Sequence, residues 1–535
     1  MFSISKDKLL FQGRMDPYSK DHNGGNSNSK YKNAFLSDLE RILFSSSFRR
    51  LQDKAQVYPL EPQDFVRTRL THSLEVSALA NSLGNIITKR INRLLNDRSI
   101  KHKELKNEMT EEKWDAENQE INRMKTDNKH IMQDMSFCLQ CAALLHDIGN
   151  PPFGHFGEDV IKKYFFDIFY TESNQERLDD KSLTEKQAII FNLIKNNEQM
   201  ENDLVHFDGN AQTIRIVTKI QNSSSKKYGL NLTYAVLGTL FKYPYSSKNA
   251  NFKHEKFGYL YSENELIETL KSLNTGNQWK VYEEGKRNPL SLIMEASDDI
   301  AYVISDFEDA IQKESIKFEN LYYISKNINK YTKGFKEASI DKCKKFIGDI
   351  LKYYENNANE DISEPLRSTI SRMISLEREN FKNSVASSFI ENCEDILNGN
   401  FEGTLIEKSD YSEFQDFLSK IKRHFVFSHN DIIVAELQGK KIINFLLKEF
   451  IDSVLSKEFE EFIKDGKKAK NENHKVLQLI SKNYVEIYKK VINDKKIKLL
   501  SEEDTYFRIR MVIDHICGMT DSYAKDTYLQ LTGNK

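Results

Sequence analysis

Glycine and proline are scarce in this sequence. The chain of 535 residues contains 21 glycines and 8 prolines, and together they reach roughly half of their share in an average protein. All-β sandwiches and barrels turn about every 8–12 residues and need many such residues. The shortage therefore argues against those folds, and it also excludes collagen-like and low-complexity sequences.

Cysteines and long apolar runs are also few. Five cysteines in so long a chain do not make a disulfide framework, which indicates a reducing compartment. The first residues, MFSISKDKLLFQGRMD, lack the apolar core of a signal peptide. No run of about 18 apolar residues occurs, so nothing is expected to span a membrane. We therefore expect a cytoplasmic protein.

Neither sign of charge dominates. The chain has 78 basic and 80 acidic residues, a formal net charge of −2. This balance gives no general electrostatic reason to bind nucleic acid. Hydrophobic residues make up 39% and aromatic residues 11%, which is enough for a large core.

Apolar residues recur at helical spacing along most of the chain, and no linker rich in proline, glycine or serine divides it. We therefore predict a mainly α fold. The predicted helices include 33–50, 71–97, 135–148, 288–313, 342–356, 431–455 and 506–530.

Two segments depart from this pattern. Residues 242–285 have a weaker helical period and several aromatic residues, which predicts a small β element. Residues 98–130 are mostly Lys, Glu, Asn and Asp, and form either a solvated helical insertion or a flexible one.

His146 and Asp147 form the first candidate for chemistry. They stand at the end of the apolar helix 135–148, just before a forced chain reversal. At a helix end that borders a cleft, both side chains can reach one metal ion, with His72 and Asp298 as further ligands. Imidazole and carboxylate ligands suit Mg²⁺, Mn²⁺, Fe or Zn. The alternative for each histidine alone is an ordinary hydrogen-bonded imidazole.

The stretch GNPPFGHFGE (149–158) is the second candidate. It holds three glycines and two prolines, so the chain turns tightly and approaches another group closely. His155 and Glu158 are three residues apart at a helix start and can touch. A carboxylate on one ring nitrogen orients the imidazole as a general acid or base. The alternative is a pair that only stabilises the helix.

Other motifs are less informative by themselves. Arg67 and Arg69, just before His72, suit phosphate binding or a surface salt-bridge pair. Cys138 and Cys141 lie within an apolar helix and are typical of small buried residues. The basic stretch 464–475 is typical of a solvated loop.

Several blocks together identify a family. The ordered set His72, His146-Asp147 and Asp298 matches the H…HD…D pattern of HD-domain metal phosphohydrolases. The sequence around these residues resembles, more specifically, the bacterial deoxyguanosine triphosphate triphosphohydrolases (dGTPases). The matching blocks are RRLQDKAQVYPL (49–60), VRTRLTHSLEV (66–76), LLHDIGNPPFGHFGE (144–158), HFDGNAQTIR (206–215), MEASDDIAYVISDFEDA (294–310), HFVFSH and ELQG (424–439) and GMTDSYA (518–524).

The resemblance implies a reaction and its central residues. Such enzymes cleave dGTP to deoxyguanosine and tripolyphosphate by attack of water at the α-phosphorus, with a divalent cation, Mg²⁺ or Mn²⁺ here. The implied metal ligands are His72, His146, Asp147 and Asp298. Asp298 is preferred to Asp299 because the family's ligand is the first acid of that run. The implied catalytic pair is His155 with Glu158.

The resemblance also implies substrate contacts. Tyr302 and Asp306 match groups at the deoxyribose, and Gln56 matches a contact to the 3′-OH. Phosphate-contacting positions match four residues, Asn210, Lys242, Tyr243 and Lys256. Glu436 resembles a base-recognition residue, which in relatives can come from a neighbouring subunit.

We predict three parts: a flexible segment 1–32, an HD-domain catalytic core 33–315 with the insertion near 98–130, and a helical region 316–535. The last part is expected to complete the nucleotide site and make oligomer contacts. Expected partners are dGTP or another dNTP, further copies of the chain (some relatives are hexamers) and single-stranded DNA as an effector.

Two alternative functions follow from the same residues. Relatives carry an arginine for guanine near 464–475, where this chain has lysines that cannot make the same bidentate contact. This favours a broader dNTP triphosphohydrolase as one alternative. The other is a regulator that binds nucleotide or single-stranded DNA with little turnover.

Overall fold

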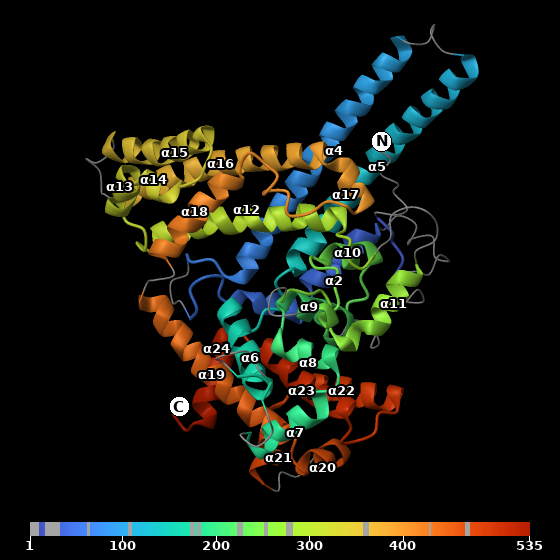
Figure 1. Cartoon of the computed structure of the whole chain (residues 1–535), viewed down its shortest axis with the longest axis vertical. Helices are drawn as coiled ribbons and strands as arrows, with labels where there is room; N and C mark the ends of the chain where they lie inside the picture. Colours follow the sequence, from blue (N-terminus) through green and yellow to red (C-terminus); the bar gives the residue numbers. More distant parts are fainter. Residues whose placement is uncertain are drawn as a thin grey trace.

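The computed structural model describes most of the chain. It covers residues 10–15, 33–60, 65–104, 110–171, 177–178, 183–221, 228–250, 255–273, 282–356, 363–426, 430–465 and 471–534. Most of segment 1–32, and parts of 98–130, 242–285 and 464–475, lie outside these ranges. Within them the protein is built from helices, as the mainly α prediction requires (Figure 1).

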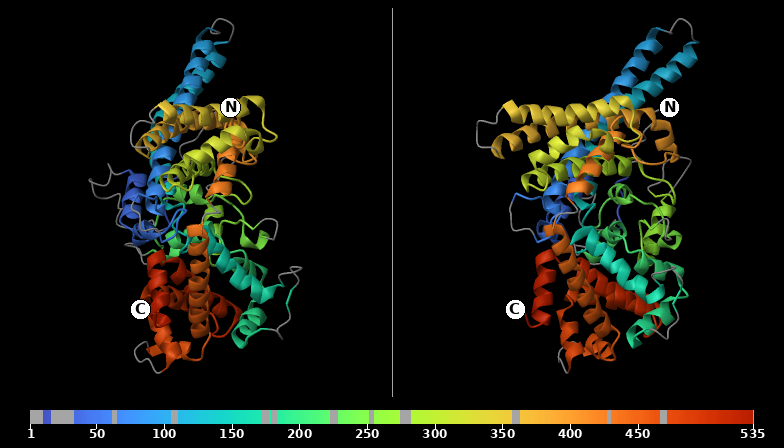
Figure 2. Two further views of the ribbon diagram at one scale, coloured as in Figure 1. Left: turned by 90° about the vertical axis from the view of Figure 1, so that its left-hand side faces the viewer. Right: turned by 60° about the vertical axis from the view of Figure 1, so that its left-hand side comes forward.

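Three long helices form the centre. α4 (Arg69–Glu104) and α5 (Glu111–Leu145) pack along each other, and α12 (Pro289–Gln312) packs against both. α12 begins where Asn288 accepts a hydrogen bond from the Leu290 amide at 2.9 Å, with proline as its first residue. The far ends of α4 and α5 project from the body in every view (Figures 1 and 2). The described parts of 98–130 are thus helical.

Short helices precede α4. They are α2 (Ala34–Leu43), α3 (Ser46–Arg49) and the 3₁₀ turn η3 (Arg50–Asp53). The sequence predicted one helix over 33–50. The structure breaks it at Phe44, because Ser45 caps α3 by accepting a hydrogen bond from the Phe48 amide at 3.2 Å.

A series of helices follows α5. It comprises α6 (Gly154–Phe169), α7 (Glu185–Ile194), α8 (Glu198–Val205), α9 (Gly209–Arg215), η6 (Ile216–Ile220) and α10 (Tyr234–Leu240). The side chain of Asp208 caps α9 by accepting a hydrogen bond from the Asn210 amide at 2.7 Å. This cap places the first turn of α9 beside the end of α5.

The predicted β element is wrong for the described part of 242–285. That part contains the turns η7 (Ser247–Asn249) and η8 (Tyr261–Glu263) and the helix α11 (Asn264–Ser272). Only isolated bridges occur there, such as the one between Ser246 and Tyr259. Two of the aromatic residues instead join a ring cluster: Tyr282 contacts both Phe241 and Tyr259, at ring-centroid distances of 4.9 and 6.1 Å.

The remaining helices form two groups at opposite ends of the body (Figure 1). The group beside α12 comprises α13 (Phe318–Lys326), α14 (Ile328–Tyr331), α15 (Glu337–Asn356), α16 (Ser363–Glu391), α17 (Cys393–Asn398) and α18 (Ser412–Phe425). The group beside α6, α7 and α8 comprises α19 (Asn430–Val454), α20 (Glu458–Asp465), α21 (Glu472–Leu479), α22 (Lys482–Lys495), α23 (Glu502–Cys517) and α24 (Asp521–Leu531).

The predicted helix 506–530 is two helices. α23 ends at Cys517, and Thr520 caps α24 by accepting a hydrogen bond from the Tyr523 amide at 3.3 Å. One buried apolar cluster joins residues of both halves of the chain, from Leu10 to Ala524. The boundary predicted at 315 therefore stays a prediction.

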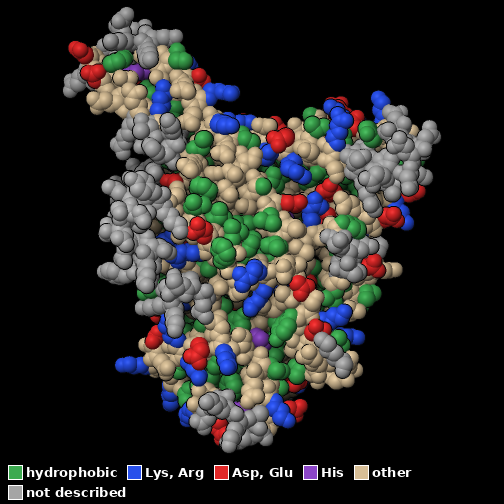
Figure 3. All heavy atoms as spheres, turned by 180° about the vertical axis from the view of Figure 1, so that it is seen from behind, with side chains coloured by type: hydrophobic (Ala, Val, Ile, Leu, Met, Phe, Trp, Pro, Cys, Tyr) green, Lys and Arg blue, Asp and Glu red, His purple; other side chains and the backbone are tan. Residues whose placement is uncertain are grey.

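The surface is mixed in charge. The face in Figure 3 shows a group of apolar side chains near its centre, and elsewhere acidic and basic side chains are interspersed. This agrees with the balanced net charge of the chain. In the described part of the chain, no helix combines the length and apolar character needed to cross a membrane.

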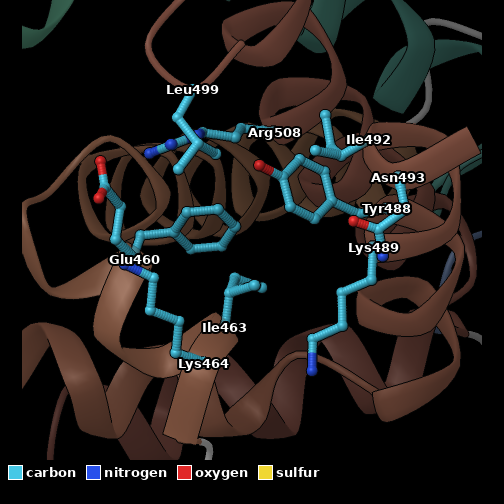
Figure 4. Close-up of a pocket in the computed structure, with 10 residues that line it drawn as sticks. Glu460, Ile463, Lys464, Tyr488, Lys489, Ile492, Asn493, Leu499 and Arg508 are labelled. Atoms are coloured by element: carbon cyan, nitrogen blue, oxygen red, sulfur yellow. The ribbon is translucent and has the colours of Figure 1, made fainter. Parts of the chain in front are cut away.

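A cavity of about 200 Å³ lies among α20, α22 and α23, in the group of helices beside α7 and α8 (Figures 1 and 4). Phe459, Tyr488 and Ile492 give it largely apolar walls. The Arg508 guanidinium beside it is bound by Asp504 (Nη2–Oδ2, 2.7 Å) and by the Val454 carbonyl (3.1 Å). This buried cation is thus balanced within the protein.

Candidate functional site

Two histidines and an aspartate from three different helices meet at the centre of the molecule. His72 lies on α4, His146 follows the last residue of α5, and Asp298 lies on α12. Their potential ligand atoms are all within 4.8 Å of one another. Asp298 Oδ1 is 3.1 Å from His72 Nε2 and 3.3 Å from His146 Nε2. The structure thus brings together three of the four predicted ligands as a cluster of metal-binding geometry.

Local hydrogen bonds orient this cluster. His146 Nδ1 lies 2.7 Å from the Ala143 carbonyl oxygen, and a carbonyl can only accept, so Nδ1 carries the proton. This fixes the tautomer that leaves Nε2 as a ligand. Nε2 is buried and has no hydrogen-bond partner of good geometry. Two imidazoles with carboxylates fit a divalent cation of the Mg²⁺, Mn²⁺, Fe or Zn group.

Asp147 lies at the edge of the cluster. Its Oδ1 is 3.6 Å from His146 Nε2 and accepts a hydrogen bond from Asn150 Nδ2 at 2.7 Å, while Oδ2 accepts from Arg69. The fourth predicted ligand is therefore next to the other three and is shared with an arginine.

Charge governs the protonation of these groups. Burial alone would raise the pKa of Asp147, but the charges of Arg69 and His146 hold it well below its usual range. Burial lowers the pKa of His146, but Asp147 and Asp298 outweigh this effect and raise it to about 9, so that a cation binding at Nε2 would displace a proton from this nitrogen. Burial would also raise the pKa of Asp298, but the His146 charge holds it well below its usual range. Both acids thus stay ionised and attract a cation.

A cleft with a volume of about 210 Å³ opens beside the cluster. Most of the predicted site residues line it. These are Gln56, Arg69, His146, Asp147, His155, Glu158, Asn210, Lys242, Asp298 and Tyr302.

The cleft is also lined by residues for which no role was predicted. These are Asn150, Thr213, Leu240, Met294 and Asp299. All of them except Leu240 stand inside recognised blocks, so block membership was an available signal. Burial raises the pKa of Asp299 to about 7, helped by Asp298 and opposed by Lys242.

His155 and Glu158 form a pair at the start of α6. His155 Nδ1 is 3.3 Å from Glu158 Oε2, and the two side chains are 73% and 3% exposed respectively. Burial alone would raise the pKa of Glu158, but the His155 hydrogen bond and the charges of Lys256 and Lys162 lower it to about 2. A buried, ionised carboxylate thus orients an accessible imidazole.

Close backbone packing makes this helix start possible. Phe153 and Gly154 both have positive φ, of 64° and 62°, a region that favours glycine. A Cβ at Gly157 would lie 2.0 Å from the Pro152 carbonyl oxygen, so no side chain fits there. The sequence 149–158 uses its glycines to fold back on itself beside Asp147.

Two lysines face the acidic groups. Lys242 Nζ is 3.7 Å from both Asp298 Oδ2 and Glu295 Oε1. Lys256 Nζ is 3.5 Å from Glu158 Oε1 and 3.4 Å from Asp208 Oδ2. Burial lowers the pKa of each lysine, but the neighbouring carboxylates outweigh it and raise both pKa values above the usual range. Both lysines are therefore cationic.

Tyr302 lines the cleft, whereas Asp306 is buried one turn further along α12. Lys422, on α18, joins them: its Nζ donates to Asp306 Oδ2 at 3.0 Å and lies 3.5 Å from the centroid of the Tyr302 ring. Nothing in the sequence around Lys422 pointed to the site, since its partner is 116 residues away.

Six predicted residues do not line the cleft. Three of them stand behind it and contact other predicted or site residues: His72 is beside Asp298, Lys256 beside Glu158, and Asp306 binds Lys422.

The other three are Arg67, Tyr243 and Glu436. Arg67 is ion-paired with Glu75, Glu308 and Asp309, the salt-bridge arrangement that was its alternative. Tyr243 lies behind Lys242, whose Nζ is 6.0 Å from its ring centroid.

Glu436 is the third. It is half-buried on α19, and burial together with the charge of Asp159 on α6 raises its pKa. It thus lies toward α6 but outside the described cleft wall.

Comparisons with known proteins agree with this geometry. The HD domain family matches residues 69–215, which run from the start of α4 to the end of α9 and contain His72, His146, Asp147 and the His155–Glu158 pair. Asp298 comes later in the chain and reaches the site through α12.

Two relatives match almost the whole chain. A deoxyguanosinetriphosphate triphosphohydrolase-like protein of Listeria monocytogenes is 34% identical over 95% of both chains. A deoxyguanosinetriphosphate triphosphohydrolase of Yersinia pestis is 31% identical over 98% of both. The protein therefore belongs to the deoxyguanosinetriphosphate triphosphohydrolase family of HD-domain proteins.

Proposed function

We propose that this protein is a metal-dependent triphosphohydrolase that cleaves dGTP to deoxyguanosine and tripolyphosphate. The observation that carries the proposal is the His155–Glu158 pair beside the His72–His146–Asp298 cluster in one cleft. The names of the Listeria and Yersinia relatives support the substrate.

The four predicted ligands His72, His146, Asp147 and Asp298 would hold the cation. A bound divalent ion supplies polarisation of a phosphate oxygen and a more acidic bound water. Magnesium or manganese is the proposed ion, since carboxylate-containing sites suit both.

The His155 imidazole handles the proton of the reaction. Attack of water at the α-phosphorus breaks the bond to the 5′-oxygen of the nucleoside, and that oxygen leaves as an alcohol once it receives a proton. Glu158 holds Nδ1, so Nε2 is the nitrogen available for proton exchange. The low pKa of Glu158 keeps this carboxylate ionised throughout the neutral range.

The cations of the cleft would bind the triphosphate. Lys242 lines the cleft together with His155, and Lys256 lies behind Glu158. Asn210 stands at the first turn of α9 and lines the same cleft. Together they stabilise the charge that accumulates on the phosphates.

The deoxyribose would lie against Tyr302, with Gln56 at the 3′-OH. Asp306 acts from behind, because its carboxylate is bound to Lys422 and is buried. A tyrosine ring against the 2′ carbon leaves no room for a ribonucleotide's hydroxyl.

A broader dNTP triphosphohydrolase is the second candidate. Within the described residues, neither Glu436 nor the lysine-rich stretch 464–475 contributes to the cleft wall, so base recognition there is weakly defined. The proposed homo-oligomer and the proposed single-stranded DNA effector are separate predictions, and a neighbouring copy is one source of a base-reading group.

A dNTP panel tests the proposal. Each of the four dNTPs is incubated with the protein and Mg²⁺ or Mn²⁺, with and without single-stranded DNA, and phosphorus NMR identifies the products. We expect tripolyphosphate, most of it from dGTP. Equal rates for all four bases would favour the second candidate, and stepwise release of orthophosphate or pyrophosphate would contradict both.

A further inference from the structure

Two buried charged residues from the recognised blocks lie outside the cleft. Lys54 belongs to RRLQDKAQVYPL and Asp521 to GMTDSYA, and they are 3% and 2% exposed. Neither lines the cleft among the described residues. Both nevertheless bind the connection 149–154, which joins His146-Asp147 to His155.

Lys54 holds the start of this connection. Its Nζ donates to the carbonyl oxygen of Asn150 at 2.5 Å and to that of Cys517 at 2.7 Å. Cys517 is the last residue of α23, and a cation is favourable at a helix C-terminus. The Lys54 side chain thus joins the connection 149–154 to the end of α23, and Lys54 and Cys517 are 463 residues apart in the sequence.

Asp521 holds the end of the connection. Its Oδ1 accepts a hydrogen bond from the Phe153 amide at 2.8 Å, and Oδ2 accepts from the Ala55 amide at 3.0 Å. Phe153 has a positive φ of 64°, a conformation that is unfavourable for a non-glycine residue and persists only where surrounding contacts hold it. The Asp521 bond is one of the contacts that impose it.

The same segment also reaches the cleft directly. The Lys54 carbonyl accepts a hydrogen bond from the Arg69 amide at 2.9 Å, and Gln56 follows two residues later. Arg69 in turn binds Asp147. The contacts of Lys54 and Asp521 therefore converge on the residues around the cation cluster and His155.

This arrangement carries a cost. Burial lowers the pKa of Lys54 to about 8, although Cys517 and Asp521 oppose the shift. An apolar side chain of similar length would avoid this penalty but could not donate to the two carbonyls. The buried ammonium of Lys54 is therefore explained by the two carbonyl oxygens to which it donates.

We propose that Lys54 and Asp521 are positioning residues, which hold the Asn150–Phe153 connection so that His155 stands over the cleft. The helices α23 and α24 are then part of the catalytic architecture, although they contribute no described group to the cleft wall. The inference rests on the proposed function for its kinetic readout only.

The test compares Lys54→Met with Lys382→Met in the full-length protein. Lys382 is also a buried lysine, paired with Glu379 on α16 and bound to Ser82, so its loss controls for a missing buried charge. In Lys54→Met we expect kcat for tripolyphosphate release to fall about tenfold or more with KM within about threefold, since small displacements of a catalytic group are costly. Lys382→Met is expected to keep both values.

Hydrogen exchange gives a readout without turnover. Amides of 149–158 should exchange about tenfold faster in Lys54→Met than in wild type or Lys382→Met, because the connection opens more often. Unchanged exchange and unchanged kcat would overturn the proposal. If wild type releases no tripolyphosphate, the proposed function fails. The hydrogen exchange of residues 149–158 then still shows whether Lys54 holds the connection in place.

Asp521 supplies the second variant series. Asp521→Asn keeps one carbonyl oxygen for the Phe153 amide, whereas Asp521→Ala keeps none. We expect kcat and exchange in Asp521→Asn to fall between wild type and Asp521→Ala. Equal exchange in the two variants and wild type would overturn the proposal independently of how Lys54→Met folds.

Discussion

Glu158 is buried beneath the imidazole that it orients, while His155 itself is largely open to the cleft, with 3.3 Å between Oε2 and Nδ1. The carboxylate is fixed by Lys256 and Lys162 as well as by the imidazole. A buried, ionised carboxylate that orients an exposed imidazole is the arrangement that general acid–base chemistry needs.

Replacing His155 by alanine should lower kcat for tripolyphosphate release by about 10²–10⁴-fold, the usual contribution of a general acid or base. Glu158→Gln should have a smaller effect, since the imidazole remains but loses its ionised partner. The assay is phosphorus NMR of dGTP with Mn²⁺.

Asp167→Asn is the control for these two variants, because Asp167 is an exposed carboxylate on the same helix that pairs with Lys163. Activity of His155→Ala within tenfold of this control would contradict the role of His155.

Metal binding should stabilise the folded protein. A ligand that binds only the native state raises the free energy of unfolding, by about 2.7 kcal/mol when its concentration is a hundred times its Kd. The melting temperature rises with it. We expect Mn²⁺ to raise the melting temperature of wild type, EDTA to reverse the rise, and Asp298→Ala to remove it. Differential scanning fluorimetry measures this without turnover.

The exposed Asp341 on α15 provides the matched carboxylate control. Asp341→Asn should respond to Mn²⁺ as wild type does. An equal rise in Asp298→Ala would place the cation elsewhere.

The sequence singled out the residues that the structure clusters, but not the groups that surround them. His72, His146, Asp147 and Asp298 were recognised because ordered motif residues carry their own spacing, and the structure brings their side chains together. Arg67 was predicted to bind substrate, but sequence alone could not separate this role from its alternative, because phosphate binding and salt bridging need the same residue type. Only tertiary structure shows that three carboxylates already surround it.

Long-range partners and chain breaks were beyond the sequence pattern. Lys422 binds Asp306, 116 residues away, and Lys54 binds the Cys517 carbonyl, 463 residues away. Lys54 stands in a recognised block, but nothing near either lysine in the sequence shows which group it contacts. The break between α23 and α24 follows from a threonine cap that apolar periodicity does not register. The aromatic residues of 242–285 predicted strands, but Tyr259 and Tyr282 pack in a buried ring cluster with Phe241 instead.

Gly149 should tolerate no side chain. A Cβ there would lie 2.1 Å from the Gly209 carbonyl oxygen and 2.4 Å from the Thr213 amide nitrogen, both backbone atoms of α9. Gly149→Ala should therefore destabilise the protein by about 2–3 kcal/mol, the usual cost of overpacking, and lower activity, since α9 carries Asn210. Urea denaturation measures the stability.

Gly348 on α15 is the matched control, because a Cβ there meets nothing within 4 Å. Gly348→Ala should raise stability by about 0.5–1 kcal/mol, as expected for a helix interior. Equal effects of the two substitutions would contradict the packing of α5 against α9.

Stability should depend on pH through Asp203 on α8. Burial raises its pKa to about 7, although Ser247, Tyr506 and Arg510 oppose the shift. The folded state therefore binds this proton more tightly than the unfolded chain, whose aspartates titrate near 4. The contribution of Asp203 to stability is full below about pH 4 and is lost as the pH rises toward 7.

Asp203→Asn does not titrate and keeps an acceptor for the Tyr261 amide, which lies 2.8 Å from Asp203 Oδ2. The melting temperature of Asp203→Asn relative to wild type should therefore rise between pH 5 and pH 8, by about 2 °C or more. Circular dichroism at pH 5, 6, 7 and 8 measures the difference, with Asp341→Asn as the exposed control, whose difference from wild type should stay constant. A constant difference for Asp203→Asn as well would show that Asp203 is ionised in the folded protein throughout this range.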